Sequence, residues 1–227
     1  NIHILRPHFG SQNGIFPHQR LLRILNHGHH MRGHPADYDQ WAQMGARGWS
    51  FADCLPYFRK LENNPAFADD QRHGSHGPLH ISSIPKTDRI IESVIAAAER
   101  CGVPRTADFN GTTQEGVGYY QLSTHNGWRA SAAVAYLRPA RKRPNLTILT
   151  GARTTRILFE KKRAIGVDYQ QGGRSHSLRA RRGVVLSAGA LQSPQLLMLS
   201  GIGPAAHLRD HDIPLVHDLP GVGQNLQ

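Results

Sequence analysis

The stretch that decides the fold of this 227-residue chain reads VVLSAGALQSPQLLMLSGIG and occupies residues 184–203. Its first three residues are apolar, which is typical of a short strand buried inside a parallel sheet. Ser193 is suited to cap a helix whose first residue is Pro194, and Gly201 can end that helix in the left-handed conformation. The stretch therefore predicts a buried strand, a tight turn and a helix.

The predicted turn is a candidate binding site for an anionic cofactor. A helix N-terminus presents free N–H groups and positive potential, and small residues before it let a ligand approach the backbone. The turn residues Ser187, Ala188 and Gly189 are therefore candidate cofactor contacts. A tight turn selected only for packing would show the same small residues, so that alternative stays open.

Upstream of the turn, the sequence predicts consecutive β-hairpins. Residues 156–159 and 164–169 flank a turn at 160–162, and the Gln171-Gly172-Gly173 turn leads into a return strand at 175–181. Residues 146–150 predict a further strand. With the helix after residue 193, these elements indicate an α/β fold class of mixed α+β character.

The first half of the chain predicts helices joined by loops and short strands. Helices are expected from Pro35, from the Ser50 cap and from Thr87 or Asp88, and an Asn126-Gly127 turn is expected between short strands. The last of these helices carries an apolar stripe that predicts core packing, at Ile91, Val94, Ile95 and Ala98. Other expected features are a loop at 63–77, strands at 77–81 and 119–123, and a helical piece through Tyr136.

Four regions follow from this survey. Residues 1–30 are irregular, residues 31–76 are helical, residues 77–150 form a sheet-containing part, and residues 151–227 contain the hairpins and the candidate turn. His27, His29, His30 and His34 lie close together in sequence. Residues 27–34 contain no carboxylate to orient these imidazoles, so no metal site is predicted there.

Composition limits the function classes. The net charge of +11 and the pI of about 10.4 raise nucleic acid as a partner, but the basic residues are scattered and do not alternate with aromatic ones. We therefore predict no nucleic-acid partner. Two cysteines and the lack of a roughly 20-residue apolar run predict a cytoplasmic protein, with peripheral membrane contact left open.

Residues 189–204 resemble the second signature of the glucose-methanol-choline (GMC) oxidoreductases. Supporting matches occur in order along the chain, so the resemblance covers about residues 31–227. The matching segments are RGHPADYDQW at 32–41, GWS at 48–50, RAS at 129–131, AYL at 135–137, RPNLT at 143–147 and GVGQNL at 221–226.

The resemblance implies a partial FAD-binding domain joined to part of an antiparallel substrate-binding sheet. The implied activity is oxidation of a small-molecule alcohol with hydride transfer to FAD, and the implied electron acceptor is quinone-like or oxygen. Thr154 lies where the family often has a valine whose backbone contacts the adenine. The family's catalytic histidine is expected beyond Gln227, so no residue here is predicted to be catalytic and the chain alone is expected to be inactive.

The resemblance is broken near the start of the chain. Where the family has a glycine- and serine-rich flavin loop, this sequence has Arg20–Ile24, although Leu25-Asn26 fits the motif in register and makes Asn26 a candidate cofactor contact. One set of codons that encodes residues 20–25 is CGG CTC CTC CGC ATC CTC, and the same nucleotides displaced by one position encode Gly-Ser-Ser-Ala-Ser-Ser. Residues before about Met31 are therefore hypothesised to come from a shifted reading frame. A non-functional remnant and a basic nucleic-acid-binding fragment are the alternative readings.

Overall fold

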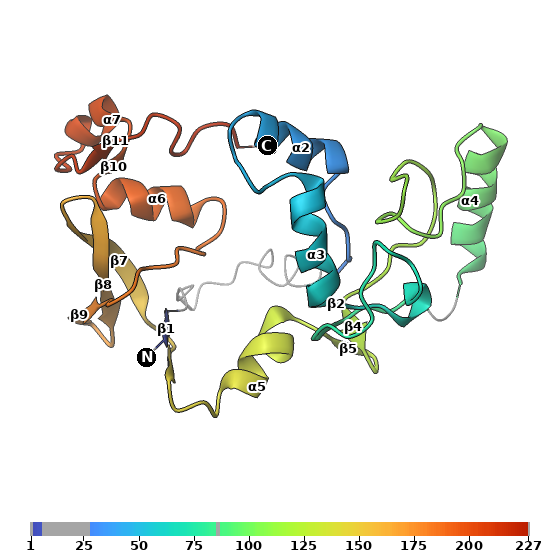
Figure 1. The fold of residues 1–227 in the computed structure, drawn as a ribbon, viewed down its shortest axis with the longest axis horizontal. Helices are drawn as coiled ribbons and strands as arrows, with labels where there is room; N and C mark the ends of the chain where they lie inside the picture. The colour runs from blue at the N-terminus through green and yellow to red at the C-terminus, as the bar shows by residue number, and fades with distance from the viewer. Residues whose placement is uncertain (1, 6–27, 85–86, 227) are drawn as a thin grey trace. The chain divides into compact units, whose positions relative to one another are not determined.

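The computed structural model describes residues 2–5, 28–84 and 87–226. Its contacts divide the chain into two compact units, Asn1–Gly14 with Arg141–Gln227 and Ile15–Ala140. We call them the sheet unit and the helix unit, and Figure 1 shows the elements of each. Helices and strands occur in both, which confirms the mixed α/β class.

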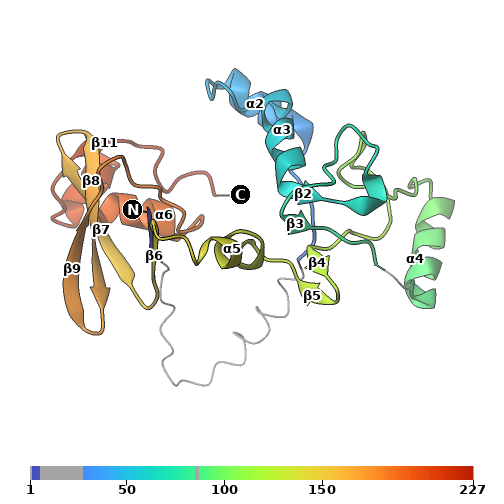
Figure 2. The same cartoon turned by 60° about the horizontal axis from the view of Figure 1, so that its bottom comes forward.

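The sheet unit is built on a three-stranded antiparallel meander. Its strands are β7 (Arg153–Glu160), β8 (Arg163–Gln171) and β9 (Arg174–Arg179), in the order β7-β8-β9, and Figure 2 shows them side by side. The tight turns need left-handed residues, and Lys161 and the Gly172-Gly173 pair have φ of 54°, 57° and 76°. Both predicted hairpins are confirmed.

Helix α6 (Gln192–Leu199) packs against β7 in the sheet unit (Figure 1). The buried Ser200 side chain joins them, because its Oγ accepts a hydrogen bond from Ile157 N at 2.8 Å and donates one to Leu196 O at 2.6 Å. Gly201 ends the helix with φ of +88°, as expected, and a β-carbon there would lie 2.4 Å from Pro214 O.

Shorter elements complete the sheet unit. The parallel pair β10 (Ile202–Gly203) and β11 (His217–Asp218) flanks α7 (Ala205–Asp210), whose Leu208 is fully buried. The predicted strand at 146–150 is confirmed as β6 (Leu146–Leu149), which pairs in parallel with β1 (Ile2–Leu5).

The stretch that precedes α6 departs from expectation. Residues 184–186 form no strand, and Val185 is 90% exposed, so the predicted buried strand is wrong. A short apolar strand needs hydrogen-bonded neighbours, and no described strand pairs with this segment. The helix also begins earlier than predicted, at Gln192 with Leu191 as its N-cap residue, so Ser193 is not the cap.

The helix unit begins with two short helices that cap themselves. Helix α2 (Pro35–Gln43) and helix α3 (Phe51–Leu61) each start with a capping box, formed by His34 with Asp37 and by Ser50 with Asp53. Neither helix has a buried residue, and they contact each other. The prediction of surface helices from Pro35 and from the Ser50 cap is confirmed.

Helix α4 (Arg89–Arg100) starts where the sequence predicts. Asp88 Oδ1 accepts hydrogen bonds from Ile90 N at 2.8 Å and Ile91 N at 3.3 Å. Of the stripe predicted as core, Ile95 is buried, whereas Ile91 and Val94 are 46% and 60% exposed. The core prediction is wrong for these two, because no described segment covers that side of α4.

Short pairings link the remaining loops. Strand β2 (Glu62–Asn63) pairs in parallel with β3 (Leu79–His80), and β4 (Thr124–His125) pairs with β5 (Trp128–Arg129) around the predicted Asn126-Gly127 turn. Residues 119–123 form isolated bridges at Leu122 in place of the predicted strand. Helical pieces occur at η1 (Pro65–Phe67), η2 (Ala133–Leu137) and α5 (Arg138–Ala140). Within the described ranges, no helix has the length and apolarity needed to cross a membrane.

Candidate functional site

The predicted cofactor turn is formed, although by different bonds from those expected. Ser193 Oγ accepts a hydrogen bond from Ala188 N at 3.1 Å, and Ser193 N donates to Gly189 O at 2.9 Å. Gly189 has φ of +91°, a conformation that favours glycine. Ser193 therefore closes the turn in front of α6.

The turn presents open backbone at the start of a helix. Ser187 and Gly189 are exposed, and a β-carbon built on Gly189 would meet no atom within 4 Å. No side chain caps the N-terminus of α6, and residues 184–199 contain no carboxylate that would repel an anion. These features fit a phosphate-bearing cofactor such as FAD.

The other candidate contacts have different surroundings. Thr154 lies half-buried on β7, paired with Tyr169 of β8, beside an irregularity in register between Thr154 and Arg156. Its backbone is thus fixed by the sheet that also supports α6. Asn26 lies outside the described residues. The structure thus groups Ser187, Ala188 and Gly189 in one turn and places Thr154 in the same unit.

The helix unit contains a buried polar network that the sequence did not predict. Glu62, at the end of α3, pairs with the Arg32 guanidinium and lies 2.9 Å from His73 Nδ1. His73 Nε2 lies 2.9 Å from Asp108 Oδ2. The side chains of Glu62 and His73 are fully inaccessible, so this chain of charges lies inside the unit.

Both ring nitrogens of His73 must donate hydrogen bonds. Ionised carboxylates only accept, and a carboxylate faces each nitrogen. Asn64 Nδ2 cannot be an alternative partner, since its two hydrogens serve Glu62 Oε1 at 2.9 Å and Gln121 Oε1 at 2.8 Å. His73 is therefore an imidazolium in this geometry.

The electrostatics agree with that assignment. Burial alone would lower the pKa of His73, but the hydrogen bonds to Asp108 and Glu62 and their charges raise it to about 9. Burial would raise the pKa of both carboxyls. The nearby His30 ring, hydrogen bonds from His73 and Asn64 and the charge of Arg32 instead hold the pKa of Glu62 far below its usual range. Hydrogen bonds from His73 and from the Asn110 backbone N–H lower the pKa of Asp108, and so do the positive charges of His73 and Arg32.

No local signal in the sequence could have identified this network. Its charged members come from residues 32, 62, 73 and 108, at spacings without a helical or strand period, and residues 63–77 read as a polar loop. The isolated Glu62 after the apolar face of α3 was the nearest signal, since a carboxylate placed there needs a partner if it is buried.

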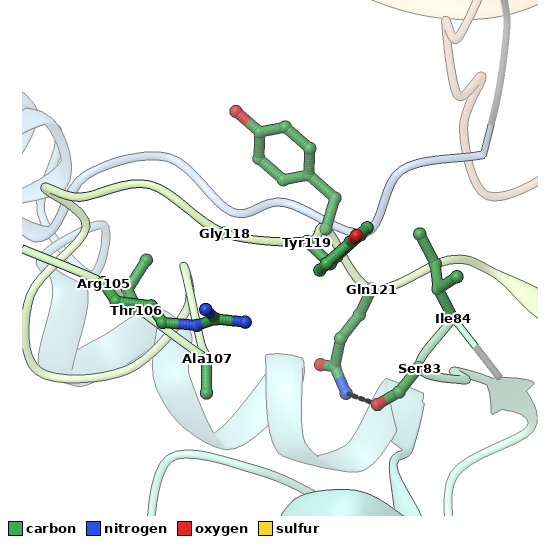
Figure 3. A pocket seen from close by; sticks show the side chains of 9 residues that line it. Ser83, Ile84, Arg105, Thr106, Ala107, Gly118, Tyr119 and Gln121 are labelled. Carbon is green, nitrogen blue, oxygen red and sulfur yellow. Dashed lines mark hydrogen bonds between the residues drawn. The ribbon is translucent and has the colours of Figure 1, made fainter. Parts of the chain in front are cut away.

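The helix unit also has an open hollow of about 230 Å³, shown in Figure 3. Gln121 Nε2 donates to Ser83 Oγ at 3.4 Å at its edge, as Figure 3 shows. Arg105 is already paired with Glu92 at 3.1 Å. With its cation neutralised, the hollow has no free charge to select a ligand. It is lined by Ser83, Ile84, Arg105, Thr106, Ala107, Gly118, Tyr119, Tyr120 and Gln121.

Comparison with known proteins identifies the family. A family model described as GMC oxidoreductase matches residues 24–227. The oxygen-dependent choline dehydrogenase of Brucella ovis is 45% identical over 224 residues, covering 97% of this chain and 40% of that protein. The enzyme of the same name from Paraburkholderia phymatum is 50% identical over 207 residues, covering 90% of this chain and 36% of that protein.

A solved structure agrees with these relatives. The FAD-dependent oxidoreductase from Chaetomium thermophilum is similar with a TM-score of 0.82 and 34% identity, covering 89% of this chain and 37% of that one. The chain thus spans about 40% of the length of the curated relatives it matches. The expected oxidoreductase class and FAD as the family's cofactor are supported. With its family model matched over residues 24–227, the chain belongs to the GMC oxidoreductases.

Proposed function

We propose that this chain is part of an FAD-dependent enzyme that oxidises a small primary alcohol, of the choline class, to the aldehyde with oxygen as electron acceptor. The observation that carries the proposal is the 45% identity to an oxygen-dependent choline dehydrogenase over 97% of the chain. General alcohol oxidation follows from the family, whereas choline and oxygen rest on the names of the relatives.

In this proposal the sheet unit holds the cofactor. The backbone N–H groups of the Ser187–Gly189 turn and the uncapped start of α6 bind its phosphates. The Thr154 backbone, which lies on β7 and is paired with Tyr169 of β8, contacts the adenine in this proposal. When bound, the flavin supplies the hydride acceptor. Asn26 is proposed as a further contact, and no residue of this chain is assigned as the catalytic base.

The cofactor site is tested in the full-length protein with matched glycine substitutions. Gly189→Asp introduces a carboxylate and a strained conformation at the proposed phosphate position, so we expect bound flavin to fall at least about tenfold. Gly183→Asp adds the same charge at another open position and should retain flavin. Equal flavin content in both variants would contradict the assignment of the turn.

The reaction is tested by alcohol-dependent oxygen consumption. The wild-type full-length protein should oxidise choline faster than longer or more branched alcohols and should consume oxygen. Turnover only with a quinone-like acceptor would instead support the quinone-like alternative. Recovery of that activity in a membrane fraction would also support the peripheral membrane contact that the sequence leaves open. A full-length protein with bound flavin and no turnover on any alcohol would contradict the proposal, and one that takes up no flavin would support the remnant reading.

A further inference from the structure

The buried network fixes one particular segment, residues 28–33. Its backbone pairs with residues 121–123 through His30 N to Gln121 O at 2.8 Å and Ser123 N to Gly28 O at 2.6 Å. On the other side, Arg32 N donates to Asn110 Oδ1 at 2.7 Å, and Asn110 Nδ2 donates to His30 O at 2.9 Å. The segment is thus held between two loops.

The Arg32 side chain ties the same segment to the charged centre. Its guanidinium donates to Glu62 and, at 2.8 Å, to Arg72 O, and it also lies over the Phe58 ring at 5.3 Å. The Nε atom of Arg32 is buried without a hydrogen-bond acceptor. Arg32 therefore depends on Glu62 for its main charge compensation.

The centre is electrically balanced only while His73 is protonated. Arg32 and the His73 imidazolium then offset Glu62 and Asp108. The other ionisable groups around His73 are His30, whose Nε2 lies 3.5 Å from Glu62 Oε1, and Arg59, whose Nε donates to His73 O at 3.3 Å. The backbone carbonyl of Asp70 accepts a hydrogen bond from His73 N, and the Asp70 carboxylate accepts one from Arg72 N.

Loss of the His73 proton disrupts this balance. A neutral imidazole has one N–H, so its other ring nitrogen would point a lone pair at a negatively charged carboxylate. The buried Glu62 and the partly buried Asp108 would then lose a shared cation, and of the two carboxylates only Glu62 is paired with the Arg32 guanidinium. A buried charge left without its partner is strongly destabilising, so the arrangement must open or admit water.

We propose that protonated His73 is a lock that holds residues 28–33 against residues 62–64 and 108–110, and that deprotonation of His73 releases this segment. The lock is an alkaline-sensitive conformational device of the helix unit, and it does not depend on the proposed catalytic function. Because the pKa of His73 is raised to about 9, release is expected around that pH.

Ring-nitrogen NMR of His73 tests the first half of the proposal in the wild-type protein. At neutral pH both ring nitrogens should be protonated, and they should titrate near pH 9. Hydrogen exchange of residues 28–33, corrected for the intrinsic effect of pH, tests the second half. Protection of the Arg32 amide should fall about tenfold or more through the same transition. This factor corresponds to the loss of one charge-assisted hydrogen bond between His73 and a carboxylate.

Two variants distinguish the effect of the His73 charge on residues 28–33 from a general loss of stability. His73→Gln keeps hydrogen-bonding groups but cannot be charged, so residues 28–33 should exchange quickly at every pH without a transition. Glu92→Gln removes the exposed pair with Arg105 in the same unit and should leave both the protection and its transition unchanged. If His73→Gln does not fold, the wild-type measurements still decide. A neutral His73 at neutral pH, or protection of Arg32 that persists as His73 titrates, would overturn the proposal.

Discussion

Gly77 shows how a single absent side chain can be required by packing. A β-carbon at this position would lie 2.3 Å from the carbonyl carbon and oxygen of Leu61 and 2.4 Å from Glu62 N, all of them backbone atoms that cannot rotate away. We expect Gly77→Ala to lower the free energy of unfolding by about 3 kcal/mol. Gly221→Ala, where a β-carbon meets nothing within 4 Å, is the control. Equal thermal midpoints for the two variants would show that the loop adjusts.

Ser200 is a second residue whose small side chain has a defined energetic role. Ser200→Ala removes the acceptor of the buried Ile157 N–H, which leaves that donor unsatisfied between α6 and β7. The expected cost is about 1–3 kcal/mol. Chemical denaturation should show this loss, whereas the same change at the exposed Ser175 of β9 should have almost no effect. A loss at Ser175 of similar size would show that the effect is not specific to the buried hydrogen bond of Ser200.

His73 also makes global stability depend on pH. Its folded-state pKa of about 9 lies above the ordinary value of 6.5, so its contribution is complete below pH 6.5, declines as pH rises and is absent above pH 9. The shift sets an upper limit of about 3 kcal/mol for this contribution. Thermal midpoints of wild type and His73→Gln should therefore converge as pH rises to 9 and above. A difference that stays constant over this range would mean that His73 acts through packing alone.

Residues whose role is local could be predicted from the sequence, and residues whose role depends on distant partners could not. Asp88 at a helix start, Gly201 at a helix end and the Asn126-Gly127 turn each follow from backbone geometry over a few neighbours. By contrast, the charged state of His73 depends on Glu62 and Asp108, which lie 11 and 35 positions away. Without that contact the sequence offers only a histidine in a polar loop.

At the scale of elements, α3 contains a feature that works against its own stability. Pro56 lies inside the helix, where it lacks the N–H that would bond to the preceding turn. We expect Pro56→Ala to raise the thermal midpoint, with a gain of up to about 3 kcal/mol if the ring also strains the helix. Pro65→Ala, at the first position of η1, should give no such gain, because proline is tolerated there. A lower midpoint for Pro56→Ala would show that the ring packs favourably.

The elements that were predicted correctly contain, within a few residues, the turn or capping residues that stabilise them. Both hairpins form because their turns contain residues suited to positive φ, and α2 and α3 form with capping boxes within four residues of their starts. The strand predicted at 184–186 and the core face of α4 failed for the opposite reason. Their apolar residues signal burial, but burial requires a second surface, and no described segment supplies one for Val185 or Val94.

At the scale of the whole molecule, the family resemblance and the structure answer different questions. The resemblance, carried by the motif after residue 189, identified the family that the comparisons then showed. Neither assigns a role to the charged network, which is a feature of packing between distant segments. The division into four regions and the shifted-frame hypothesis for residues before Met31 stay predictions, and the gene sequence across codons 20–25 tests the latter directly.

Cofactor uptake by the 227-residue chain alone rests on few contacts. Its proposed FAD contacts in the described residues are one turn and the Thr154 backbone, and Val185 beside that turn is 90% exposed and outside any sheet. The segment that leads into the turn has no sheet behind it, so ordering this segment would cost conformational entropy that phosphate contacts alone do not offset. We expect the isolated chain to emerge from gel filtration without flavin, while the full-length protein retains it. A one-to-one yellow complex of the isolated chain would show that these residues form a sufficient site and that the exposed segment orders when the cofactor binds.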